Sequence, residues 1–170
     1  MTNKNLKLLL CAALSCTLSP SLLAQGPTTA THVPEVDIMT VFEHMGNTID
    51  QQIRVVDIGD EINVGVGILQ RKGTRTEGEE GNAIVHHWMT DVCYVLSGSG
   101  TLVTGGEQSS PREFPADNIS VVELIGPSGS RVVVNGQTKT ISTGDVVIIP
   151  AGVPHGFRNI QDQITYLSIR

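Results

Sequence analysis

Positive charge is scarce in this sequence, and no stretch of the chain gathers it. The 170 residues hold 11 lysines and arginines against 17 aspartates and glutamates, which gives a formal net charge of −6. Aromatic residues make up only 4% of the chain, and no basic arm or basic patch interleaved with aromatic residues occurs. Since nucleic acid is bound mainly through positive charge on the protein, the composition argues against a nucleic-acid partner.

Other signatures of chemistry are missing as well. The sequence contains no nucleophile–base triad and no glycine-rich loop that would cradle a phosphate. Hydrolase and nucleotide-binding functions therefore have little support. The chain is also too short for two separate hydrophobic cores, which predicts a single folded domain.

The N-terminus has the form of an export signal. Two lysines precede an apolar run at residues 8–18, and Ala24 is a plausible cleavage point. The run is too short to span a bilayer as a permanent anchor. We therefore predict a signal peptide over residues 1–24 and an exported protein, periplasmic or secreted. A buried N-terminal helix and a lipoprotein signal ending at Cys16 are the alternatives.

Few cysteines remain after such a signal is removed. Cys11 and Cys16 lie within it, so the mature chain keeps Cys93 alone and cannot form an intramolecular disulfide. Residues 1–24 contain two lysines and no acidic residue, so the net charge of the mature chain falls from −6 to −8.

Short β-branched runs separated by glycine and proline predict an all-β domain over residues 53–170. Apolar side chains alternate along residues 62–68, and another strand is expected at 92–96. Helical periodicity is weak, and residues 25–52 are interpreted as a leader with a short helix or loop over 41–52. This pattern is typical of a double-sheet jelly-roll β-barrel around a small-molecule cavity.

Two glycine-containing segments predict hairpin turns. Ser97–Gly100 separates the strand at 92–96 from a run at 101–104. Asn135 and Gly136 separate β-branched runs at 131–134 and 137–141, and Asn-Gly is the strongest short hairpin signal in the chain.

The segment from residue 144 to residue 159 carries the most information about function. A β-branched run at 146–149 predicts a buried strand, and the following Pro-Ala-Gly forces a tight corner. His155 then opens the next strand. Counting by two, Phe157 and Asn159 share its face, and all three are expected to point into one cavity. An inward histidine in an apolar cavity needs a hydrogen-bond partner or a metal.

The spacing of this segment resembles the second motif of the cupin superfamily. The residues that match it are Gly144, Pro150, Gly152, His155 and Asn159. An upstream segment is similar to the first cupin motif, through Gly78, His86, Asp91 and Gly98. Ile84 occupies the position of that motif's first histidine.

The resemblance implies a cupin jelly roll with a metal in the barrel. In metal-binding cupins the ligands come from both motifs, and here they carry over to His86, Asp91 and His155. The implied cofactor is a divalent transition metal, with Fe, Mn, Ni and Zn all accepting such donors. Ile84 cannot ligate, and Asp91 is one methylene shorter than the usual glutamate. His87 is either an additional ligand or a residue that supports the ligands from outside, and alternation along a regular strand would turn it away from the metal.

Five residues are expected to line the cavity around that centre: Ile84, Trp88, Cys93, Phe157 and Asn159. Cys93 is interpreted as an apolar wall residue, with a soft ligand or catalytic thiol as the alternative. Trp88 would either stack on a substrate ring or pack at the barrel rim.

A long link at residues 105–130 separates the two motifs, and it has two interpretations. It is either a surface loop followed by an extra strand in the apolar run 119–125, or a lid over the barrel mouth. In the second case Phe114 would act as an apolar plug.

Two functions remain. The first is a small exported metal-dependent cupin enzyme that acts on a small organic molecule by oxygenase, isomerase or lyase chemistry. The alternative is a non-catalytic small-molecule-binding cupin with a degenerate metal site. Because cupin barrels commonly pair through their sheets, a homodimer is expected.

Overall fold

The computed structural model describes residues 28–75 and 81–170. The predicted signal peptide, its cleavage point at Ala24 and Gly78 of the first motif all lie outside the described residues. Within the described part, no helix is long and apolar enough to cross a membrane.

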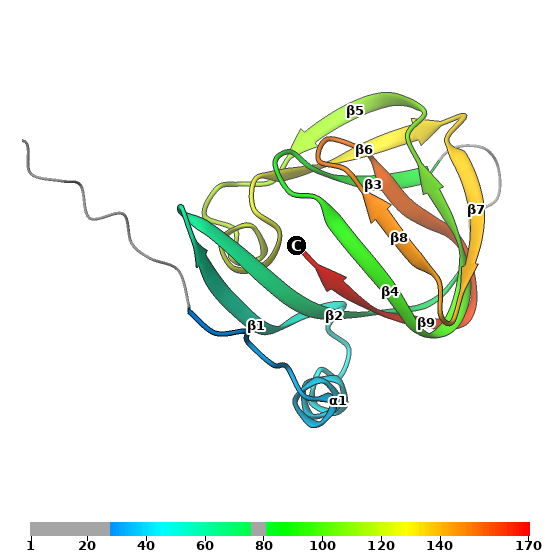
Figure 1. Ribbon diagram of the computed structural model, residues 1–170. Helices are drawn as coiled ribbons and strands as arrows, with labels where there is room; N and C mark the ends of the chain where they lie inside the picture. Colours follow the sequence, from blue (N-terminus) through cyan, green and yellow to red (C-terminus); the bar gives the residue numbers. More distant parts are fainter. Residues whose placement is uncertain (1–27, 76–80) are drawn as a thin grey trace, which may run out of the picture.

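Strands make up most of the described chain, with a short helix before them (Figure 1). In chain order the elements are α1 (Glu35–His44), β1 (Asp50–Gly59), β2 (Ile62–Arg75), β3 (Gly81–His86), β4 (Asp91–Thr104), β5 (Glu107–Glu113), the π-helical turn η1 (Val121–Ile125), β6 (Ser128–Val134), β7 (Gln137–Ser142), β8 (Val146–Ile149) and β9 (His155–Ile169).

The strands close into a jelly-roll barrel, which confirms the predicted all-β fold. One run of neighbours is β1-β2-β9-β3-β6-β5, and β4 pairs with β7, β8 and β9. Strand β9 joins the two halves because it pairs with β2 along one edge and with β4 along the other. In Figure 1, β3, β5 and β6 lie along the top, β4, β7 and β8 on the right, and β1 and β2 below.

The core lies between these halves and is formed by side chains that alternate inward. Val95 of β4 and Ile164 of β9 have no exposed surface, and Ile160 is 2% exposed. They belong to a single buried cluster with Leu102, Ile141 and Tyr166. Such a cluster is the apolar interior that a closed barrel requires.

The helix begins earlier than the sequence analysis expected. It spans Glu35–His44 rather than residues in 41–52, and the sheet begins at Asp50. Pro34 precedes the helix, and acidic Glu35 and Asp37 lie in its first turn. Proline followed by acidic residues favours a helix start, because negative charge stabilises the N-terminal end of the helix dipole.

The hairpin expected at Ser97–Gly100 is wrong. Strand β4 runs unbroken from Asp91 to Thr104, with register shifts against β9 in this segment. Gly98 has a φ of +80°, and a Cβ at this position would collide with the carbonyl oxygen of Gln163. The glycines therefore bend one strand tightly across β9 and do not reverse the chain.

The hairpin expected around Asn135 and Gly136 is also wrong, although a turn does form there. Asn135 adopts a φ of +55°, as a tight turn requires. However, β6 pairs with β3 and β5, whereas β7 pairs with β4. The turn therefore carries the chain from one sheet of the barrel to the other.

The long link between the motifs contains an extra strand, but at a different place from the one expected. Strand β5 covers Glu107–Glu113, is exposed along its whole length and pairs with β6. The apolar run that follows is not a strand, because Val121–Ile125 form the π-helical turn η1, in which Val121 and Ile125 are buried.

Candidate metal centre and cavity

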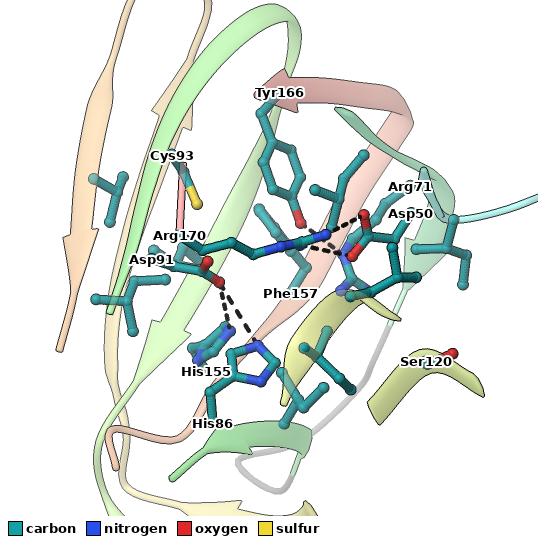
Figure 2. A pocket seen from close by; sticks show the side chains of 18 of the residues that line it. Asp50, Arg71, His86, Asp91, Cys93, Ser120, His155, Phe157, Tyr166 and Arg170 are labelled. Carbon is teal, nitrogen blue, oxygen red and sulfur yellow. Dashed lines mark hydrogen bonds and ion pairs between the residues drawn. The ribbon is translucent and has the colours of Figure 1, made fainter. Parts of the chain in front are cut away.

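A cavity of about 330 Å³ lies inside the barrel. Its walls are mostly apolar and come from both halves of the barrel and from the long link, as Figure 2 shows from close by. Ligand pockets usually measure about 300–1,000 Å³, so a cavity of this size suits a small molecule.

Three of the predicted site residues meet in this cavity. His86 ends β3, Asp91 begins β4 and His155 begins β9, so each is fixed at a strand terminus. The Nε2 atoms of His86 and His155 lie 3.6 Å and 4.0 Å from Oδ2 of Asp91. One donor atom from each residue lies within 4.8 Å of the other two, and Figure 2 shows both rings turned toward the carboxylate.

Hydrogen bonds fix which nitrogen of each imidazole carries the proton. Nδ1 of His155 lies 3.1 Å from the Val153 carbonyl oxygen, which can only accept. Nδ1 of His86 lies 2.8 Å from the Ser128 hydroxyl, whose own proton is donated to the Ile125 carbonyl. Both Nδ1 atoms therefore donate, and both Nε2 atoms present a lone pair to the centre.

The carboxylate is held in the same way. Oδ1 of Asp91 accepts a hydrogen bond of 2.8 Å from the Ser168 hydroxyl, and this leaves Oδ2 facing the two imidazoles. Two nitrogen lone pairs and one carboxylate oxygen, with no proton between them, are a donor set that fits a divalent transition metal. Their outer hydrogen bonds resemble those that orient ligands in metal sites.

Burial keeps both imidazoles neutral. It lowers the pKa of His86 to about 4, and the neighbouring His155 adds to this effect while Asp91 opposes it. Burial also lowers the pKa of His155. Neutral rings at pH 7 have the Nε2 lone pairs available as metal ligands.

Ile84 and His87 lie as strand alternation predicts. Ile84 faces the cavity beside His86, and its Cα pairs with that of His155 on β9. His87 points outward, where its Nε2 lies 2.6 Å from Oε2 of Glu113. His87 therefore takes no part in the cluster, and Ile84 adds no ligand to it.

Cys93 and Phe157 line the cavity as expected. Burial raises the pKa of the Cys93 thiol to about 12, so the group is a protonated wall residue and not a thiolate. This favours the structural interpretation of Cys93 over that of a soft ligand or catalytic thiol.

Two predicted cavity residues lie elsewhere. Trp88 follows the end of β3 and is 83% exposed, so it does not line the cavity. Asn159 is exposed and borders a different, outer pocket. Phe157 pairs with Leu102 and Asn159 with Thr101, so Arg158 is an extra residue in β9. This bulge reverses the alternation after Phe157 and turns Asn159 outward.

The long link forms part of the cavity wall. Phe114, Asn118, Ser120 and Leu124 all line it, together with Ile125 of η1. The arrangement agrees with the interpretation of residues 105–130 as a cover of the cavity with Phe114 as an apolar contact, while β5 within the same link provides the extra strand.

The cavity also holds a charged group of residues that no sequence motif indicated. Arg170 reaches Asp50 across the cavity and binds it with two hydrogen bonds, of 2.8 Å and 3.0 Å (Figure 2). Arg71 donates from Nε to the Tyr166 hydroxyl at 3.1 Å. Alternation along β2 could have indicated that Arg71 points inward, because it shares a strand face with the apolar Leu69.

Comparison with known proteins agrees with this architecture. The sequence profile described as "Cupin domain" matches residues 129–169, from β6 through β9, and this segment includes His155. Together with the jelly-roll barrel, the match over this segment confirms the resemblance to the cupin superfamily that the motifs predicted. No curated protein matches the chain.

Several solved structures are similar to this chain at low sequence identity. The protein BH2720 from Bacillus halodurans is 18% identical over 85% of this chain and 83% of its own, with a TM-score of 0.42. The Clostridium difficile EutQ protein is 14% identical over 62% of this chain and 54% of its own, with a TM-score of 0.36. Hydroxypropylphosphonic acid epoxidase from S. wedmorenis is 11% identical over 72% of this chain and 51% of its own, with a TM-score of 0.43. This chain thus spans about half the length of the latter two, and similarity at this level says nothing of function.

Proposed function

We propose that this protein binds one divalent transition metal ion through His86, Asp91 and His155 and acts on a small organic molecule in the adjoining cavity. The observation that carries the proposal is the convergence of two unprotonated Nε2 atoms and one carboxylate oxygen in a buried place. Neutral imidazoles cannot donate a hydrogen bond from Nε2 to the carboxylate, so a cation is the partner that all three groups lack.

The metal would supply Lewis-acid or redox chemistry, because three protein ligands leave coordination positions for water and substrate. Iron, manganese, nickel and zinc are the candidates. Oxygenase, isomerase and lyase reactions all suit such a centre.

The protein's own residues would prepare the reaction. Ser128, Val153 and Ser168 hold the three ligands in one orientation through the hydrogen bonds described above. The apolar walls, including Ile84 and Phe157, exclude water and so strengthen electrostatic interactions inside the cavity.

A second candidate is a cupin that binds a small molecule without turning it over. Ile84 supports this alternative, since it removes one of the donors that metal-binding cupins use. In that case the cavity would still bind a ligand, and His86, Asp91 and His155 would contact this ligand directly, without a metal ion.

Substitution of single histidines tests the proposal. His155→Ala should remove most of the bound metal after reconstitution with zinc, because only two protein ligands remain, and even loss of an outer hydrogen bond costs about 10–100-fold in affinity. His87→Ala is the matched control, since this ring contacts Glu113 on the outside. Equal metal contents in both variants, measured by elemental analysis, would contradict the assigned ligand set.

Export and pairing remain part of the proposal. The N-terminal lysines, the apolar run at 8–18 and Ala24 support a mature chain that begins near Gln25. Mass spectrometry of protein from its native host tests this, and a retained segment 1–24 would contradict it. The expected homodimer is tested by light scattering at micromolar concentration, where a monomer mass would contradict it.

A further inference from the structure

Arg71 enters the cavity from β2 and is held in a fixed orientation. Its Nε donates to the Tyr166 hydroxyl at 3.1 Å, and its guanidinium carbon lies 5.9 Å from the centre of the Phe157 ring. A hydrogen bond on one edge and an aromatic ring on one face together fix the plane of the guanidinium. In Figure 2, Arg71 and Tyr166 lie on the other side of the cavity from His86 and His155.

The terminal nitrogens of Arg71 have no protein acceptor in the described part of the chain. They make no hydrogen bond, and no described carboxylate forms an ion pair with them. Asp50 is the carboxylate nearby, but both of its oxygens accept hydrogen bonds from Arg170. Arg71 is therefore a half-buried, oriented cation that shares the single nearby carboxylate, Asp50, with Arg170. Its terminal nitrogens face the cavity without a protein acceptor, and such a group can bind an anion.

Tyr166 adds a second donor at the same place. Its oxygen accepts the hydrogen bond from Arg71, and no acceptor for its own proton occurs among the described residues. Burial raises the pKa of Tyr166 above its ordinary value, so the hydroxyl keeps that proton at neutral pH. The hydroxyl and the guanidinium edge can thus donate to one ligand group together.

The walls between this pair and the candidate metal centre are mostly apolar, apart from the Arg170–Asp50 ion pair that crosses the cavity. Leu69, Ile84 and Phe157 all line the same cavity of about 330 Å³. A ligand of this cavity therefore meets the positive charge of Arg71 on one side and the histidines with Asp91 on the other. Between them it meets apolar side chains and the Arg170–Asp50 ion pair.

We propose that the cavity binds a small organic carboxylate, with its carboxylate group on Arg71 and Tyr166 and its apolar body directed toward His86, Asp91 and His155. The planar fork of arginine matches the two oxygens of a carboxylate. This inference deepens the proposed function and rests on it for the role of the His86 end; the anion contact itself does not require a metal.

Matched probes of equal shape test the inference. Isothermal titration calorimetry would compare benzoate with benzamide, and hexanoate with hexanamide, on the zinc-loaded and the metal-free protein. We expect each carboxylate to bind about 10–100-fold more tightly than its amide, because only the carboxylate has a negative charge and two acceptor oxygens to pair with the guanidinium. The full chain is used throughout, with circular dichroism as the check on folding.

Two variants locate the contact. Arg71→Met keeps the length and apolar character of the side-chain stem but should abolish the preference for the acid. Tyr166→Phe should reduce it by a smaller factor. Arg54→Met is the matched control and should leave the preference unchanged, since Arg54 pairs with Asp37 at the surface.

The outcomes separate this inference from the proposed function. Equal affinity for acid and amide in the unmodified protein, absence of carboxylate binding at millimolar concentration, or a preference that survives in folded Arg71→Met would each overturn it. A protein that prefers carboxylates yet takes up no metal would support the anion site and contradict the proposed metal centre. Metal uptake without any preference for carboxylates would support the proposed metal centre and contradict the anion site.

Discussion

Acid should destabilise the metal-free protein through His86. Burial lowers the pKa of this histidine from 6.5 to about 4, so between these pH values the unfolded chain binds a proton that the folded chain does not. Stability must then rise with pH through this window and fall as the pH drops toward 4. The difference is roughly two and a half pKa units, and at about 1.36 kcal/mol each it amounts to about 3 kcal/mol. The lowered pKa of His155 acts in the same direction.

Urea unfolding of the metal-free protein, followed by circular dichroism at a series of pH values between 7 and 4, measures this effect. His86→Gln removes the titrating group. Between pH 7 and 4, the free energy of unfolding of this variant should therefore fall by about 2–3 kcal/mol less than that of the unmodified protein. His32→Gln is the matched control, because His32 is an exposed histidine. The reasoning would be refuted by identical pH profiles for the unmodified protein and His86→Gln.

Two further substitutions test the barrel and the centre. Gly98→Ala should destabilise the fold by several kcal/mol or prevent folding, because Gly98 has a positive φ and a Cβ would collide with the carbonyl of Gln163. Thermal unfolding measures the effect. Gly81→Ala is the control, because a Cβ at residue 81 would meet only Arg158, at 4.0 Å. Ile84→His should tighten zinc binding by about tenfold or more, since residue 84 faces the cavity beside His86, and unchanged affinity in a competition titration with a chelator would contradict this.

Local signals predicted the parts of the chain whose structure depends on nearby residues. The β-branched run at 146–149 and the Pro-Ala-Gly corner placed the bounds of β8 and the start of β9 at His155 as the structure has them. The burial expected for this run was wrong, because Val146 and Ile148 are exposed and only the opposite face of β8 turns inward. Alternation likewise placed Ile84 and Cys93 in the cavity wall and His87 outside. In each case the residues that decide the conformation are neighbours in sequence.

Errors arose where a distant partner decides the conformation. The bulge at Arg158 exists because β9 pairs with β4, and nothing in the sequence around Asn159 indicates it. Asn135 and Gly136 form a turn, but whether the flanking strands pair depends on the closure of the whole barrel.

The charged end of the cavity was missed for the same reason. Arg71 and Tyr166 are 95 residues apart, and Asp50 and Arg170 are 120 apart. Antiparallel pairing of β2 with β9 and of β1 with β2 brings these strands together. No motif or spacing links such residues, so only the folded chain shows that they share one cavity.

The most direct test of the central claim is the metal content of the unmodified protein after separate reconstitution with iron, manganese, nickel and zinc. Elemental analysis should give close to one metal ion per chain for at least one of them, and X-ray absorption should show nitrogen and oxygen ligands at about 2.0–2.2 Å with no sulfur near 2.3 Å, because Cys93 is a protonated wall residue. A ratio near zero with all four metals would contradict the metal centre and leave the non-catalytic binding protein as the remaining function.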